Sequence, residues 1–252
     1  MESRIARELK VRYQPVAIIF TDEKPEDALQ FKEGSRGCVV AMLSAVGRGE
    51  TAVFDRRTYG CGGGGVGLGF GNTFSGAPGG IEYFLSTGRG EGYPEGEGYR
   101  KTPELARAFL DKLPITDIPF DYVVFKPLEQ VEPDKETPQM VTFYVNADQL
   151  TALVVLANYD QPSSDNVIIP SAAGCQSVCL IPYHETQQEH PRAVVGMMDI
   201  SARPHVDPDI LSFTVPYQMF LRMEANVPGS FFEKGAWRKV SARIPDHPPE
   251  NV

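Results

Sequence analysis

Four cysteines carry the most evident chemistry of this sequence: Cys38, Cys61, Cys175 and Cys179. Cys61 lies in the run YGCGGGGVGLGFGN, where eight glycines fall between positions 60 and 71. In a reducing cytosol, four cysteines indicate metal ligands or reactive thiols more than disulfides. The function is therefore expected to depend on what these thiols hold or attack.

The cysteines outside the glycine run are expected on helices. Cys175 and Cys179 are four residues apart on a predicted helix, so both thiols project from one face, a turn apart. Cys38 is expected at a helix N-terminus, where the helix dipole favours a thiolate. These settings suit anionic sulfur.

The glycines around Cys61 form the second part of the expected site. Backbone at Gly60, Gly62, Gly63 and Gly64 can approach a cofactor closely and direct N–H groups at anionic sulfur. We therefore expect these four glycines to bind the cofactor that the thiols hold.

The four thiols match the Cys₄ set of an iron–sulfur cluster or of structural zinc. We predict an iron–sulfur protein with a redox or small-molecule-converting role, in which Cys38, Cys61, Cys175 and Cys179 hold a 4Fe–4S cluster. The spacing matches neither a ferredoxin run nor a zinc ribbon, because only one pair is close in sequence. Two alternatives stay open: a metal-free thiol enzyme with Cys61 as nucleophile, and a small-ligand-binding protein whose cysteines only pack.

Other motifs give weaker indications. Gly62-x-Gly64-x-x-Gly67 satisfies the dinucleotide fingerprint, but we expect no helix to start in this run, which disfavours a nucleotide. No G-x₄-G-K-[ST] or G-x-S-x-G pattern occurs, and HETQQEH (184–190) has the wrong spacing for a zinc helix. Arg203 could bind an anionic substrate, although a surface salt bridge is the simpler interpretation.

The elements that must position these residues alternate irregularly, which predicts an α+β fold with a mixed α/β sheet packed with helices. Hydrophobic periodicity predicts strands over 16–20, 121–128, 140–146, 193–200 and 211–216. It predicts helices over 2–12, 38–46 (capped by Ser35), 103–113, 149–159 (capped by Asp148), 172–181 (capped by Ser171) and 217–224. We expect one domain over 1–245, a glycine-rich loop region over 60–100 that covers the site or admits a substrate, and a loose tail over 246–252.

Composition limits the partners. The 252 residues carry 33 Asp+Glu against 24 Lys+Arg, a net charge of −9, which argues against nucleic acid. The longest apolar stretch, 152–157, is too short to span a bilayer, and the N-terminus lacks an apolar signal core. We expect a soluble, cytoplasmic protein whose partner is a small-molecule substrate or an electron-transfer protein. A homo-oligomer is possible, and whether the chain is an enzyme stays open.

Several segments together resemble a known family. PVAIIF, YGCGGGGVGLG, the stretch from FKPLEQ to LANY, SAAGCQSVC and DISARP occur in that order, and the resemblance covers residues 5–225. The chain resembles the uncharacterised ArCR family, a domain-of-unknown-function group found largely in anaerobic bacteria and archaea. The resemblance implies a redox or metal role for Cys61 and Cys175. Members often carry a Gly-Cys where this chain has Met198-Asp199-Ile200, so a ligand there is absent or replaced by Asp199.

Overall fold

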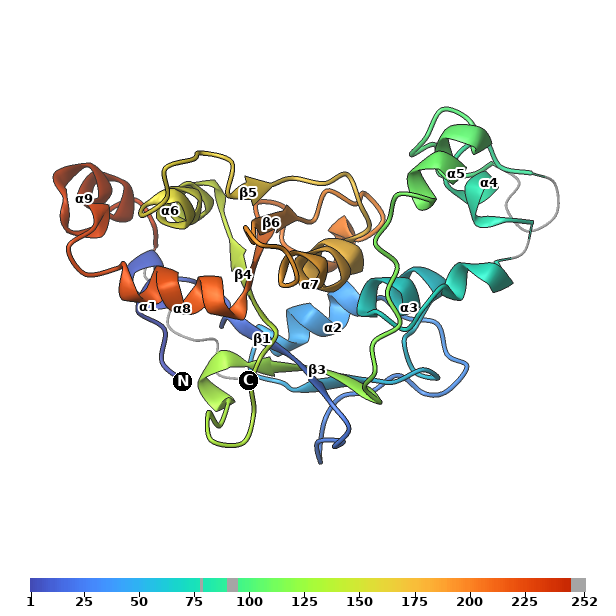
Figure 1. Ribbon diagram of the computed structural model, residues 1–252, viewed down its shortest axis with the longest axis horizontal. Helices are drawn as coiled ribbons and strands as arrows, with labels where there is room; N and C mark the ends of the chain where they lie inside the picture. Colours follow the sequence, from blue (N-terminus) through green and yellow to red (C-terminus); the bar gives the residue numbers. More distant parts are fainter. Residues whose placement is uncertain (78, 90–94, 246–252) are drawn as a thin grey trace.

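The computed structural model describes residues 1–77, 79–89 and 95–245, and its centre is a seven-stranded sheet (Figure 1). Across the sheet the strands are β2 (Ala52–Phe54), β3 (Tyr122–Pro127), β1 (Val16–Thr21), β4 (Met140–Val145), β7 (Leu211–Pro216), β6 (Ala193–Gly196) and β5 (Val167–Ile168). All neighbours pair antiparallel except β5 and β6, which are parallel. The mixed sheet and its helices confirm the predicted α+β class.

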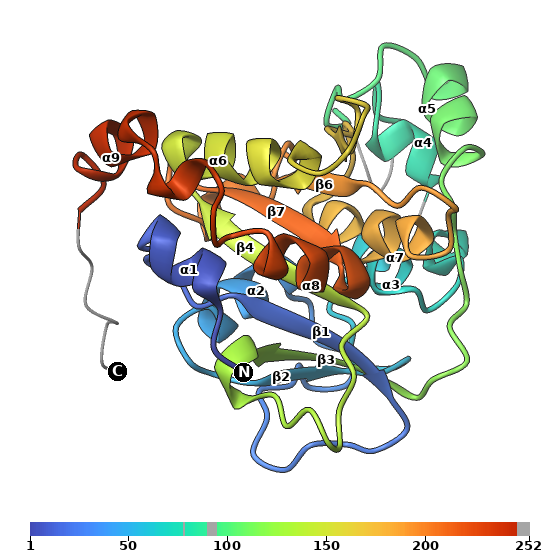
Figure 2. The ribbon, with the colours of Figure 1, turned by 60° about the vertical axis from the view of Figure 1, so that its left-hand side comes forward.

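Helices cover both faces of the sheet. One face, here called the α8 face, packs against α1 (Arg4–Leu9), α6 (Ala147–Asn158), α8 (Tyr217–Ala225) and α9 (Gly235–Ser241). The opposite face, here called the α3 face, packs against α2 (Val39–Val46), α3 (Gly62–Leu68), the π-helical turn η3 (Gln176–Leu180) and α7 (Ile181–Glu185). Figure 2 shows α1, α6 and α8 together along β4 and β7.

Strand β1 illustrates why the sheet is buried on both sides. Ala17 and Ile19 pack on the α8 face, whereas Val16, Ile18 and Phe20 pack on the α3 face. All five are buried, as expected for a central strand whose two faces are both covered. The register pairs Ile18 with Phe125 on β3 and with Met140 on β4.

The predicted caps are wrong at three helices. Helix α6 begins at Asn146, not at Asp148, because Asn146 and Gln149 form a reciprocal capping box. Ser35 does not cap α2, since its hydroxyl donates to the Lys32 carbonyl and Cys38 occupies the N-cap. Ser171 caps nothing either, because the helical backbone starts three residues later, at Gly174.

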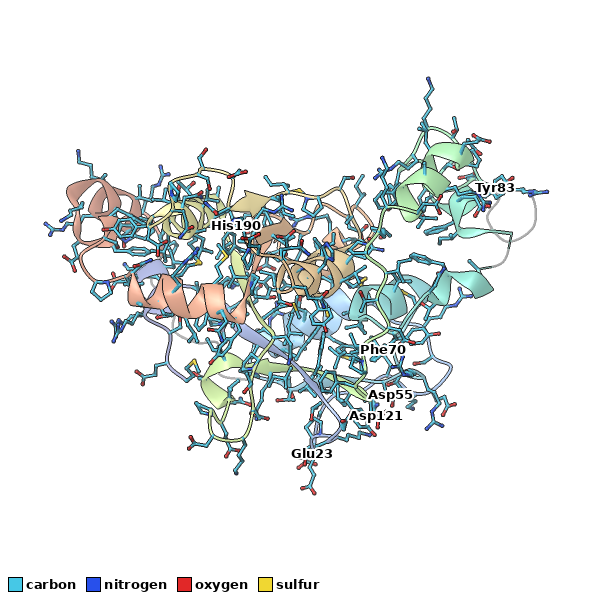
Figure 3. The ribbon with its side chains drawn as sticks, in the orientation of Figure 1. Glu23, Asp55, Phe70, Tyr83, Asp121 and His190 are labelled. Atoms are coloured by element: carbon cyan, nitrogen blue, oxygen red, sulfur yellow. The ribbon has the colours of Figure 1, made fainter. Side chains whose placement is uncertain are left out.

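The region 60–100 is more regular than predicted. Besides α3, it contains the 3₁₀ turn η1 (Thr73–Gly76) and α4 (Ile81–Phe84), which packs against α5 (Pro103–Leu110). Figure 1 shows α4 and α5 standing away from the sheet, and Figure 3 places Tyr83 in this part of the molecule. Glu82 on α4 pairs with Arg107 on α5. Positions 78 and 90–94 of this region, and the predicted loose tail 246–252, lie outside the described residues.

The remaining short elements are turns of 3₁₀ helix. They are η2 (Leu128–Gln130), η4 (Arg203–His205) and η5 (Phe231–Glu233). Turn η4 directly follows the loop after β6 and lies against α2, because the Ser44 hydroxyl donates to the His205 carbonyl at 2.7 Å. The loop after β6 is thereby held beside α2.

Candidate functional site

The glycine run forms a helix, contrary to prediction. Helix α3 spans Gly62–Leu68 and begins at Cys61, whose sulfur accepts the Gly64 N–H at 3.2 Å. It ends at Gly69, which adopts the left-handed conformation that glycine tolerates best at this position. Low helix propensity predicts a loop, but capping at both ends and tertiary packing override it.

Close packing explains why α3 is built from glycine. A Cβ on Gly67 would lie 2.5 Å from the Cys175 sulfur, and one on Gly64 would lie 2.4 Å from the Tyr59 carbonyl oxygen. Real Cβ atoms do not approach neighbours this closely, so larger side chains would push α3 away from η3. The glycines therefore bring the backbone of α3 directly against the cysteine-bearing helix.

Cys61 and Cys175 lie on opposite sides of one peptide group. The Gly64 N–H donates to the Cys61 sulfur, and the Cys175 thiol donates to the Gly63 carbonyl at 3.1 Å. In a trans peptide the C=O and N–H point in opposite directions. The Gly63–Gly64 peptide therefore separates the two sulfurs.

Cys179 faces the other end of α3. Its sulfur lies 3.9 Å from the Leu68 carbonyl, five positions along α3 from the carbonyl that Cys175 contacts. Five residues of helix rise about 7.5 Å. Cys175 and Cys179 therefore share a helix face, but they contact separate points of α3 and do not converge on one centre.

Cys38 is the N-cap of α2 and lies near Cys61. Burial raises the pKa of the Cys38 thiol, the N–H groups of Val40 and Ala41 oppose this, and the nearby Cys61 and Asp199 raise the pKa further. Burial likewise raises the pKa of Cys175 well above its usual value, with added contributions from Cys61, Cys38 and Asp199. Three thiols and one carboxylate are thus close enough to interact electrostatically.

The four thiols differ in access to solvent. Cys61 is exposed, Cys38 is half-buried, and Cys175 and Cys179 are buried. Burial also raises the pKa of Cys179. Cys61 is therefore the thiol that a dissolved reagent meets first.

Asp199 holds the start of the Cys175 helix. Its carboxylate accepts the Gly174 N–H at 2.9 Å and both the N–H and the hydroxyl of Ser201. Asp199 therefore acts as a hydrogen-bond acceptor for the backbone before Cys175. The sequence indicates Asp199 only as a replacement ligand. The position of Gly174 directly before Cys175 is the one sequence feature that points to this backbone contact with Asp199.

Two irregular backbone features lie next to Asp199 and Gly174 in the chain. Met197 is buried with a positive φ of 67°, which unbranched L-residues rarely adopt. The helix after Gly174 contains the π turn η3, in which the Ile181 N–H donates to Gln176, five residues back. Such features concentrate at functional sites, where the surrounding structure maintains the strain.

The structure contradicts the predicted iron–sulfur cluster. Within 1–77, 79–89 and 95–245, no group of three or more His, Cys, Asp or Glu side chains is arranged to hold a metal ion. The prediction that Cys38, Cys61, Cys175 and Cys179 bind 4Fe–4S is therefore wrong, and the zinc alternative has no support. The physical reason is the spread along α3: a peptide group separates Cys61 from Cys175, and Cys179 lies at the far end.

The four glycines predicted to bind the cofactor surround Cys61. Gly64 donates to the Cys61 sulfur, and the Gly63 carbonyl accepts from Cys175. The Gly62 carbonyl accepts the Thr73 hydroxyl, and the Gly60 carbonyl accepts the Gly37 N–H. These contacts fix the loop and the first turn of α3 around the exposed thiol.

Arg203 and His184 form hydrogen bonds with residues other than the cysteines. Arg203 donates to the carbonyls of Asp207, Pro208 and Ile210, so it holds this loop through backbone hydrogen bonds. His184 contacts Gln188. Figure 3 places His190 well away from α3 and from Phe70, the residue that follows α3 closely in the chain.

The segment just before α5 reaches the backbone that leads into the Cys175 helix. Arg100 donates to the Ser171 carbonyl at 3.3 Å. Burial raises the pKa of Tyr99; Ser201 opposes this rise, and the nearby Glu97 and Asp199 add to it. Residues 99–100 thus lie beside the Asp199 loop, although their types alone did not indicate this.

A surface groove lies elsewhere, lined by α1 and by residues that flank it in the chain. Its volume is about 640 Å³, and its lining includes Arg4, Arg7, Gln14 and Glu129. No cysteine lines it. The groove and the thiols are therefore separate features.

A family model described as Uncharacterised ArCR matches residues 4–226, which confirms the resemblance found in the sequence. No curated protein and no solved structure matches the chain. In the part of the chain that is described, none of the helices combines the length and apolar character needed to cross a bilayer.

Proposed function

The chain belongs to the ArCR family, and we propose from its own residues that it is a thiol-dependent enzyme with Cys61 as the nucleophile. The observation that carries this proposal is the contrast between Cys61 and the other thiols. Cys61 alone among the four is exposed, and its sulfur accepts a backbone N–H at the first turn of α3. Thiolates are the reactive form of cysteine, and such an N–H supports the charged sulfur.

The surroundings of Cys61 suit a reactive group more than a structural one. The chain carries glycine at Gly64 and Gly67 so that α3 can approach Tyr59 and Cys175 closely. Met197 in the left-handed region and the π turn η3 adjoin the same cluster. A face built only for packing does not require these features.

The proposed substrate is a small electrophilic molecule. Cys61 is reached from solvent, whereas burial raises the pKa of Cys38 and Cys175 and keeps them protonated at neutral pH. The attack therefore starts at Cys61, and the cytoplasm that we propose as its location keeps the thiol reduced.

Intact-mass spectrometry of the reduced chain with substoichiometric iodoacetamide at pH 7 tests this proposal. We expect one adduct, located at Cys61, and its loss in Cys61→Ser. Cys179→Ala is the matched control, because Cys179 is buried at the far end of α3, and it should give the wild-type adduct. An adduct that persists at the same rate in Cys61→Ser contradicts the proposal.

A further inference from the structure

The chain segments that lead into α2 and α3 run against each other. The Gly37 N–H donates to the Gly60 carbonyl at 3.3 Å. A Cβ on Gly60 would lie only 2.6 Å from the Gly37 carbonyl oxygen, so the two backbones are in direct contact. Cys38 and Cys61 are the next residues of these segments, and each is the N-cap of its helix.

Side chains continue this contact into the helices. The Val39 methyl group lies 3.1 Å from the position that a Cβ on Gly64 would occupy, and Gly64 donates to the Cys61 sulfur. The first turns of α2 and α3 therefore pack together where their cysteines lie. The two thiols also interact electrostatically, since the Cys61 charge raises the pKa of Cys38.

Cys175 is a poorer partner for Cys61 than Cys38 is. The Gly63–Gly64 peptide stands between Cys61 and Cys175, because its two ends bind the two sulfurs. A bond between these sulfurs would require both hydrogen bonds to break. No hydrogen bond of this kind joins Cys38 to that peptide within the described part of the chain.

Access differs between Cys38 and Cys61 in a way that suits exchange with a disulfide. The exposed Cys61 can reach a dissolved disulfide first, whereas the half-buried Cys38 is shielded from it. Thiol–disulfide exchange requires a thiolate and a leaving thiolate, and it needs no separate general base. His184 contacts Gln188, and the His205 carbonyl accepts the Ser44 hydroxyl, so neither of these contacts supplies a base to Cys61.

We propose that Cys38 is the resolving thiol of Cys61 and that the substrate class is a low-molecular-weight disulfide; this rests on the proposed function. The Cys61 thiolate attacks one sulfur of the substrate disulfide, forms a mixed disulfide and releases the first substrate thiolate. The Cys38 thiol passes its proton to the first released thiolate; its sulfur then attacks the Cys61 sulfur, forms the Cys38–Cys61 disulfide and releases the second substrate thiolate. The substrate gains two electrons, and the two protein thiols lose two.

The test uses the fully reduced chain, without air, and bis(2-hydroxyethyl) disulfide as the probe. We expect two molecules of 2-mercaptoethanol released per chain and a Cys38–Cys61 link in the peptide map. Cys38→Ser should release one and keep the mixed disulfide on Cys61. Cys175→Ser can keep the hydrogen bond to Gly63, and it should release two like the wild type.

The outcomes separate this inference from the proposed function. A map that shows Cys61–Cys175, or a mixed disulfide that persists on Cys61 in the wild type, overturns the role of Cys38. If iodoacetamide labels Cys61 but the disulfide does not react there, the substrate class is wrong while the nucleophile stands. If Cys61 reacts with neither reagent, the proposed function itself fails. Protection of the buried Cys175 and Cys179 from iodoacetamide in Cys38→Ser, as in the wild type, confirms that this variant folds.

Discussion

The two faces of the sheet use different kinds of packing. On the α8 face, ordinary aliphatic and aromatic side chains such as Leu153, Phe143 and Phe220 fill the space between strands and helices. On the α3 face, glycines bring backbones into contact with cysteine side chains, and Met197 keeps a positive φ. Proteins depart from simple packing rules mainly where function requires it. The α8 face is thus an ordinary hydrophobic core, and the α3 face is where we propose the chemistry.

The largest expected effect comes from the α8 face. Phe143 on β4 is fully buried, and its ring centroid lies 6.2 Å from that of Phe220 on α8. Phe143→Ala should lower the free energy of unfolding by about 3–5 kcal/mol, because it leaves a cavity. Urea unfolding measures this loss. Iodoacetamide should still label Cys61 in the folded fraction at the wild-type rate. A slower rate would show that packing on the α8 face affects the reactivity of Cys61 on the α3 face.

On the α3 face a single added methyl group should be disruptive. In Gly67→Ala the new Cβ would lie 2.5 Å from the Cys175 sulfur and 2.9 Å from the Cys175 carbonyl carbon. We expect a loss of about 1–3 kcal/mol from overpacking. Gly63→Ala is the matched control in the same helix, since its nearest neighbour beyond the helix backbone, the Cys61 sulfur, lies 3.8 Å away. Equal losses in thermal unfolding of both variants would refute the close-packing explanation of α3.

A smaller effect is expected at the cap of α6. The Asn146 side chain accepts the Gln149 N–H at 3.0 Å, and the Gln149 side chain accepts the Asn146 N–H at 2.9 Å. Asn146→Ala should lower the free energy of unfolding by about 1 kcal/mol. Asp148→Ala tests the cap that the sequence predicted, and it removes the ion pair with Arg243 instead. If Asp148→Ala is the more damaging substitution, the capping box is not what starts α6.

The smallest effect depends on pH. Burial raises the pKa of the Cys179 thiol, so the unfolded chain loses this proton at lower pH than the folded chain. The resulting stability is present below the usual thiol pKa of 9.0 and is lost as pH rises above it. Between pH 7 and pH 9.5, this lowers the free energy of unfolding by about 0.8 kcal/mol. Cys179→Ala should show a drop smaller by that amount, and equal drops in urea titrations would contradict it.

The α8 face and the sheet were largely predictable from sequence. Strand periodicity identified the strands around Ile18 and Phe143, because local pattern and tertiary burial agree there. The caps were less predictable, since Asn146 and Asp148 are both suitable N-cap residues and only the position of Gln149 distinguishes them. A two-residue change in helix start is beyond what propensity resolves.

The α3 face was only partly predictable. The sequence predicts Cys61 and the glycine run as the centre of the site, which stays a prediction, and it predicts the helix face shared by Cys175 and Cys179. It did not predict that the run is itself a helix, because some of the contacts that stabilise α3, those from Cys175 and Cys179, come from more than 100 positions away. Since the sequence alone does not show those contacts, four thiols in favourable settings look like the ligands of one metal centre.

The central claim is that Cys61 is the reactive thiol of the α3 face. Differential alkylation with light and heavy iodoacetamide, before and after unfolding, measures the rate at each cysteine of the native chain at pH 7. Cys61 should react about tenfold faster than Cys38 or more, and Cys175 and Cys179 should react only when the chain unfolds. Labelling of Cys38 or Cys175 as fast as Cys61 would contradict the account.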